Sequence, residues 1–156
     1  MFDLILRNGT VVTPHGTSRQ DVAISGEAIS AITSPDAIDN TQTKRSIDVN
    51  GKIVMPGGID PHVHCKWIMP MPDGTFGFTE GPEIVSRAAL YGGTTTLIDF
   101  AARLEDIPFS EVIEKRDHDW VGNCYCDYSY HLMLLGDVEP PVLSELESLI
   151  GDGYPT

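Results

Sequence analysis

The chain has 156 residues, of which 41% are hydrophobic, and a formal net charge of −13. This composition is typical of a soluble globular protein of about one domain, and no apolar run approaches the ~18 residues that a membrane span needs. Because ten Lys and Arg residues are too few for the basic face that binds a phosphate backbone, we expect neither a nucleic acid nor a membrane as partner.

Residues 1–55 have the pattern of an antiparallel β unit. Short apolar runs with alternating polar residues are typical of strands, and Asn8-Gly9 and Ser25-Gly26 have the composition of tight hairpin turns. The polar stretch over 34–43 predicts a loop. The expected strands are 3–7, 10–13, 20–25, 28–33, 46–49 and 52–55.

After Met55 the pattern changes to strands that alternate with helices. A helix is expected over 80–91, ending at two glycines, and a buried strand over 94–100. Ser110 has the character of an N-cap for a second helix that ends near Gly122. A strand over 124–135 and a helix over 142–150 follow. This alternation indicates an α/β fold, a parallel sheet covered by helices.

Two α/β architectures fit such an order of elements. An open doubly wound sheet normally carries a glycine-rich phosphate loop after its first strand, but here that place holds His62-Val63-His64. A (β/α)8 TIM barrel places functional groups at the carboxyl ends of its strands, and we prefer it. Because a barrel takes about 250 residues, we expect residues 56–156 to form only its first βα units and the chain to be incomplete.

His62 and His64 are the candidate metal ligands. Alternate residues of a strand point the same way, so both imidazoles reach one ion, and histidine nitrogen suits zinc or a similar ion. By spacing alone, two ordinary hydrogen-bonded histidines fit equally well. The preceding Gly57-Gly58 allows close backbone approach, and Asp60 is placed to orient an imidazole.

Other polar side chains of the βα region have two interpretations each. Asp99 is either a carboxylate that orients a ligand or, as we prefer, a cap of a strand end or of the next turn. His131 either lines the pocket or is a hydrogen-bonded core histidine, and we prefer the second. The segment Asp117-His118-Asp119 is expected to face solvent without a chemical role.

The three cysteines show no disulfide framework. Cys124 and Cys126 lack the two-residue gap of zinc-binding pairs, so we expect them to serve in packing, and Cys65 to be a buried apolar residue. Free thiols are typical of a reducing compartment, and the chain start, Met1-Phe2-Asp3, lacks the features of a signal peptide. We therefore expect a cytoplasmic protein.

The stretch 66–82, rich in Pro, Gly and bulky apolar residues, is expected to be an irregular loop after the first barrel strand. Loops at this end of a barrel determine specificity. The apolar side chains fit either the wall of a substrate pocket or a contact with a second subunit.

Four blocks of the sequence together resemble the cyclic amidohydrolases, and most closely the dihydropyrimidinases and hydantoinases. They are 3–12 (DLILRNGTVV), 51–64 (GKIVMPGGIDPHVH), 92–100 (GGTTTLIDF) and 127–131 (DYSYH). The resemblance covers essentially the whole chain. It implies a metal-dependent (β/α)8 barrel joined to a small β-sandwich that both chain ends form, in a homo-oligomer, a dimer or tetramer.

The resemblance also implies the metal centre and the reaction. His62 and His64 match the first two ligands of a site for two divalent ions, most simply Zn²⁺. The bridging carbamylated lysine, two further histidines and the aspartate that serves as general base are expected beyond this sequence, so no catalytic residue is assigned within it. The expected reaction is hydrolysis of a C–N bond in a cyclic amide or imide, such as hydantoin or a dihydropyrimidine, by a metal-bound hydroxide.

Alternatives remain for the substrate and for activity itself. After His64, hydantoinase-like chains commonly have a Leu-Asp type pair and a short glycine-rich loop, whereas this chain has Cys65-Lys66-Trp67 and a long aromatic stretch. An allantoinase or a dihydroorotase shares the ligands and differs in this loop. A non-catalytic scaffold protein of the same fold is the remaining alternative.

Overall fold

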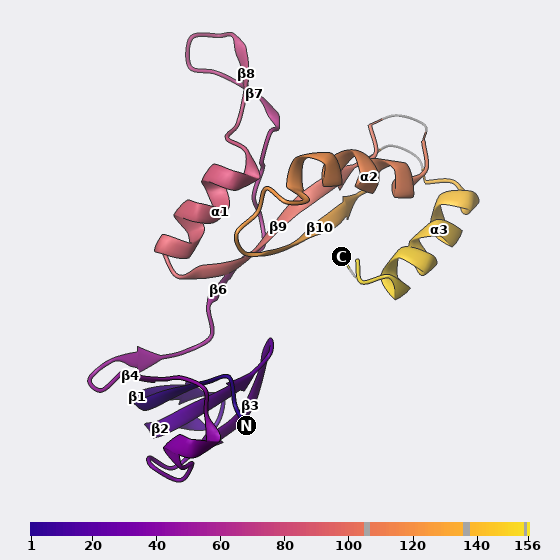
Figure 1. Cartoon of the computed structure of the whole chain (residues 1–156). Coiled ribbons are helices and arrows are strands. Elements are labelled where there is room, and N and C mark those ends of the chain that lie inside the picture. Colours follow the sequence, from indigo (N-terminus) through magenta and orange to yellow (C-terminus); the bar gives the residue numbers. More distant parts are fainter. Residues whose placement is uncertain (105–106, 136–137, 155) are drawn as a thin grey trace. The chain divides into compact units, whose positions relative to one another are not determined.

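The computed structural model describes residues 1–104, 107–135, 138–154 and 156, which form two compact units, Met1–Pro56 and Gly57–Thr156 (Figure 1). Each unit has its own sheet and its own buried apolar cluster. Within the described ranges, every helix is too short or too polar to cross a membrane.

The first unit is built on one five-stranded mixed sheet. Strands β1, β2 and β3 are antiparallel neighbours, as predicted, but β4 and β5 both run parallel to β1. The prediction of a wholly antiparallel unit is therefore wrong for its last two strands, because the connection through the short 3-10 helix Asn40–Gln42 returns the chain to the start of β1. The strands are β1 Leu4–Thr13, β2 Gly16–Ser25, β3 Ala28–Thr33, β4 Ser46–Asp48 and β5 Ile53–Val54.

Asn8-Gly9 lies at a β-bulge inside β1, formed by Arg7 and Asn8, and not in the hairpin turn that its composition predicts. Between the pairs Leu6 to Val22 and Gly9 to Gln20, two residues of β1 stand opposite Asp21 alone. Asn8 takes the left-handed conformation, φ 63°, and its N–H donates to the Asp21 carboxylate at 2.8 Å. The extra residue is thus absorbed within the strand. The Ser25-Gly26 turn is confirmed, since β2 ends at Ser25 and β3 begins at Ala28.

The second unit has the predicted alternation of strands and helices around a three-stranded parallel sheet of order β10-β9-β6. Helix α1 ends at Tyr91 with Gly92 as its C-cap, and Gly93 follows with φ 85°, so the predicted glycine stop is confirmed. The elements are β6 Gly58–Asp60, β7 Ile68–Pro70, β8 Phe76–Phe78, α1 Pro82–Tyr91, β9 Thr94–Ala102, α2 Phe109–Trp120, β10 Asp127–Met133 and α3 Pro140–Gly151.

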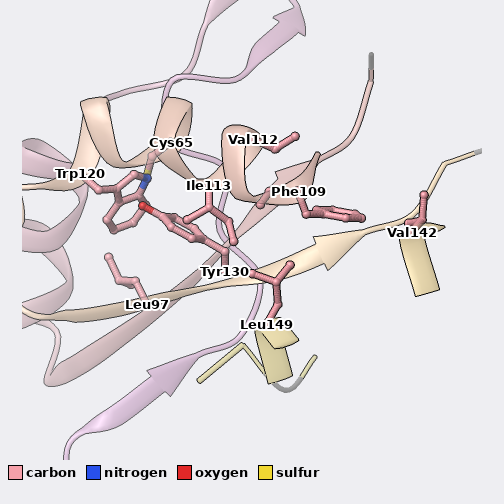
Figure 2. Close-up of a cluster of buried hydrophobic side chains, with 10 residues drawn as sticks. Cys65, Leu97, Phe109, Val112, Ile113, Trp120, Tyr130, Val142 and Leu149 are labelled. Carbon is pink, nitrogen blue, oxygen red and sulfur yellow. The ribbon is translucent and has the colours of Figure 1, made fainter. Parts of the chain in front are cut away.

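The two faces of β9 have different roles. Leu97 and Ala101 are buried in the apolar cluster that Figure 2 shows, together with Tyr130 of β10 and Trp120 of α2. The alternate residues Ile98 and Phe100 point to the opposite face, as the period of two in a strand requires. The cluster also contains Cys65, so the predicted burial of this cysteine is confirmed.

The stretch after the histidines is a hairpin and not the irregular loop predicted for it. Strands β7 and β8 pair antiparallel, with Ile68 opposite Phe78. The turn contains Asp73, whose carboxylate accepts the Thr75 N–H at 3.0 Å, and Gly74 with φ 84°. Such a Pro-Asp-Gly sequence is a turn signal, which the high Pro and Gly content of the whole stretch obscured.

Ser110 does not cap helix α2. The helix begins at Phe109, so Ser110 lies in its first turn, and the N-cap position, Pro108, offers no side-chain acceptor. Glu145 of α3 accepts the N–H groups of Phe109 and Ser110, each at 2.9 Å. The sequence predicts that a local serine binds the free N–H groups at the start of this helix, but a carboxylate from another helix binds them instead.

Candidate metal centre

His62 and His64 lie just past the end of β6, where the chain is still extended beside β9. The Val63 N–H donates to the Ile98 carbonyl at 3.1 Å, which continues the parallel pairing through the histidine segment. Val63 and Cys65 pack into the apolar cluster, so the two imidazoles share the other face. Their Nε2 atoms are 3.2 Å apart.

This spacing fits two ligands of one metal ion. With zinc at 2.0–2.1 Å from each nitrogen, two nitrogens 3.2 Å apart subtend about 100° at the ion, close to the tetrahedral angle. His62 is exposed and His64 half-buried, so the pair is reachable from solvent. Within the described part of the chain, no third His, Cys, Asp or Glu completes a cluster of three.

Aromatic rings hold the imidazoles in place. The Phe100 ring stacks on the His64 ring with 5.0 Å between centroids and 17° between planes, and it meets the His62 ring edge-on at 4.7 Å. The Trp67 ring contacts the His64 ring from another direction, at 4.9 Å. These contacts restrict the rotamers of both histidines, and the sequence had not singled out Phe100.

Asp60 does not contact an imidazole. Its carboxylate accepts the backbone N–H of His62 at 3.1 Å, so it orders the backbone and not the ring, contrary to expectation. The buried Nδ1 atom of His64 has no hydrogen-bond partner among the described residues. The hydrogen bond that usually orients a metal-binding imidazole is thus missing for His64, and ring packing takes that role.

Asp99 does not cap a strand end, but its carboxylate accepts a backbone N–H of the turn that follows His64. Strand β9 continues to Ala102, so Asp99 lies in a strand interior, and its carboxylate contacts no histidine. It is fully buried on the helix-facing side, where it accepts the Cys65 N–H at 3.1 Å and the Trp67 indole N–H at 2.9 Å. Arg116 of α2 completes the set as its ion-pair partner.

His131 is hydrogen-bonded through both ring nitrogens, as predicted, but it is half-buried at the candidate site and not in the core. It pairs in register with Phe100, and the two rings are 5.1 Å apart. Its Nε2 lies 2.8 Å from the Pro61 carbonyl and its Nδ1 2.8 Å from the Thr156 hydroxyl. Both nitrogens are occupied, so His131 adds no ligand in this arrangement.

The remaining candidates are structural. All three cysteines are free, and burial raises the pKa of Cys65 to about 12, which keeps this thiol protonated. Burial, aided by the nearby Cys124, likewise raises the pKa of Cys126 to about 12.

In the segment 117–119, only His118 is exposed. Asp117 accepts the Tyr130 hydroxyl at 2.9 Å and Asp119 pairs with Lys66, so the expectation of a solvent-facing segment is wrong for both aspartates.

Comparison with known proteins gives one consistent result, although no protein-family model matches. The chain is 34% identical over 151 residues to a D-hydantoinase of Streptomyces coelicolor, covering 96% of this chain and 31% of that protein. The crystal structure of a dihydropyrimidinase from Brevibacillus agri matches with a TM-score of 0.80 and 36% identity, covering 97% of this chain and 31% of that one. The chain is a hydantoinase-like amidohydrolase sequence, matching the N-terminal portion of that family.

The extent of the match separates the hydantoinases from a second group of relatives. An allantoinase of Escherichia coli is 37% identical, but over only 98 residues, which is 63% of this chain and 19% of that protein. The hydantoinase-like chain spans about a third of the length of the hydantoinases that it matches, as the 31% coverage states.

Proposed function

We propose that the protein to which this chain belongs hydrolyses a C–N bond of a cyclic amide, such as hydantoin or a dihydropyrimidine. We further propose that His62 and His64 bind one of two divalent ions, with zinc as the simplest choice. The observation that carries the proposal is the pair of Nε2 atoms 3.2 Å apart, beside a parallel strand of a hydantoinase-like chain. This spacing fits a shared ion.

The residues of this chain would hold and shield the metal. His62 and His64 would be ligands through Nε2 and not proton acceptors. Phe100 packs against both rings and excludes water from that side of the pair. Divalent ions in such a site make a water molecule more acidic and polarise a carbonyl group. The general base, the carbamylated lysine and the other ligands are proposed to come from sequence outside this chain.

The wider architecture is part of the same proposal. The three parallel strands with their helices would be the first units of a (β/α)8 barrel, residues 56–156, and residues 1–55 one layer of a β-sandwich. The small exposed hairpin, with Phe76 and Phe78 more than two-thirds exposed, fits a pocket wall or a subunit contact in a dimer or tetramer. Three free cysteines fit a cytoplasmic location.

Ring hydrolysis is tested with the full-length protein on hydantoin, dihydrouracil, allantoin and dihydroorotate. We expect hydantoin or dihydrouracil to be the best substrate. Preferred turnover of allantoin or dihydroorotate would assign the protein to one of those related activities, and absence of turnover with any ring would favour the scaffold alternative.

Metal binding is tested with His62→Ala and His64→Ala. Because loss of an outer partner of a ligand costs 10–100-fold, loss of a ligand itself is expected to reduce activity by at least about 100-fold, together with a fall in bound metal. His118→Ala is the control, since this histidine is exposed on α2. Full metal content and full activity in both ligand variants would refute the assignment.

A further inference from the structure

A buried ion pair lies directly beneath the turn that follows His64. Asp99 of β9 is completely buried, and Arg116 of α2 is its partner. The same Arg116 nitrogen also donates to the Cys65 carbonyl at 2.9 Å. The pair therefore connects β9 and α2 to the backbone immediately after the histidine segment.

Asp99 accepts hydrogen bonds from the residues before and after Lys66, a residue of this turn that has an unusual backbone conformation. Its Oδ2 accepts the Cys65 N–H and its Oδ1 accepts the Trp67 indole N–H. Between them Lys66 has φ 53°, a left-handed backbone that a residue with a side chain rarely adopts. Such a conformation persists only where the surrounding structure determines it.

Two further contacts connect this turn to His64 itself. The Thr79 hydroxyl donates to the His64 carbonyl at 2.6 Å and accepts the Trp67 N–H at 2.9 Å. The Trp67 ring, anchored by Asp99, packs against the His64 ring at 4.9 Å. The position of the His64 ring thus depends on the turn, and the turn depends on Asp99.

We propose that Asp99, together with Arg116, is a positioning residue for the metal ligand His64. It fixes the Cys65–Trp67 turn so that the His64 Nε2 faces the His62 Nε2. The inference rests on the proposed metal-binding function and adds to it a residue that contacts neither metal nor imidazole. The carboxylate is required because it accepts four donors, including the Phe100 N–H at 2.7 Å. An Asn has one acceptor oxygen and would turn its NH₂ toward donors.

The test uses Asp99→Asn in the full-length protein. We expect Zn²⁺ affinity, measured by competition with a chelator, to fall 10–100-fold, as for other outer partners of metal ligands. With Co²⁺ in place of Zn²⁺, the visible absorption bands should shift, because they report ligand geometry. A general loss of stability would not change these bands in the folded fraction.

Asp21→Asn is the matched control. Asp21 is equally buried and pairs with Arg7 at 2.9 Å, but it lies in the first unit. This variant should keep the wild-type Co²⁺ spectrum and Zn²⁺ affinity within about twofold, well inside the 10–100-fold effect expected at Asp99. If Asp99→Asn does not fold, Arg116→Lys replaces it, since Lys keeps the charge but lacks the two-nitrogen fork by which Arg116 reaches Asp99 with one nitrogen and Asp119 with the other.

The outcomes separate the two proposals. If His64→Ala loses metal while Asp99→Asn, or Arg116→Lys in its place, keeps wild-type affinity and spectrum, the positioning role is refuted and the metal site stands. If His64→Ala keeps its metal, the metal site itself is refuted. Equal spectral changes in the Asp99 and Asp21 variants would also overturn the positioning role.

Discussion

Gly57 illustrates at the scale of one residue how closely the strands pack below the histidines. A Cβ atom at this position would lie 2.1 Å from Oγ1 and 2.7 Å from Cβ of Thr95 in β9. We therefore expect Gly57→Ala to lower the free energy of unfolding of the second unit by about 1–3 kcal/mol, as overpacking does. Urea denaturation measures this value. Gly151→Ala, with open space around its Cβ, is the control, and equal stability of the two variants would contradict the argument.

Sequence reasoning at the residue scale succeeded where the backbone repeat alone decides the geometry. That His62 and His64 share a face follows from the period of two in an extended chain. The partners of Asp99 could not be predicted in this way, because Arg116 lies on a helix and comes near Asp99 only when α2 packs on β9. The carbonyl bound by His131 likewise belongs to Pro61, 70 residues away. Such contacts depend on the packed layers and leave no local pattern in the sequence.

At the scale of elements, helix α2 depends on α3 for its N-terminus. Glu145 accepts two N–H groups of the first turn of α2, a position without a side-chain cap of its own. We expect Glu145→Ala to lower the free energy of unfolding by about 1–2 kcal/mol at pH 7, the upper range for loss of a cap. Glu147→Ala, an exposed position on α3, should change it by less than about 0.5 kcal/mol.

The same contact should depend on pH. Burial by itself would raise the pKa of Glu145, but the Ser110 and Phe109 N–H groups outweigh it and lower the pKa below the usual 4.5. A carboxyl group with a lowered folded-state pKa contributes stability above its unfolded pKa, and the contribution disappears as pH falls through the folded value. The stability difference between wild type and Glu145→Ala should therefore shrink below about pH 4.5. A constant difference down to pH 2 in thermal melts would contradict this.

Two of the errors in element prediction share one physical cause, competition between local composition and distant partners. Asn8-Gly9 has the residues of a turn, yet the Asp21 carboxylate binds both the Asn8 N–H and the Arg7 side chain and keeps the strand continuous as a bulge. Ser110 has the residue type of a cap, yet Glu145 supplies the acceptor. In both places a carboxylate from another element overrides the local preference.

At the scale of the whole molecule, hydrophobic periodicity predicted the order of helices and strands after Met55, except for the β7–β8 hairpin. It did not predict that β4 and β5 join β1 in parallel, since strand direction depends on the path of the connection and not on the apolar pattern. Of the candidate site, the sequence predicted only the histidine pair, because both histidines lie on one segment, directly after strand β6. Its aromatic wall, Phe100 and Trp67, comes from other segments and required the structure.

The histidine pair alone should hold metal weakly. Structural and catalytic zinc sites use three or four protein ligands, whereas the described residues bring only His62 and His64 together. We expect the isolated 156-residue chain to retain fewer than one zinc after gel filtration, measured by mass spectrometry of the metal, and to leave hydantoin intact. The double variant His62→Ala/His64→Ala should abolish even weak binding seen in titrations. Two zinc ions held stoichiometrically by the isolated chain would mean that its own residues complete the site, and the proposed need for further ligands would then be wrong.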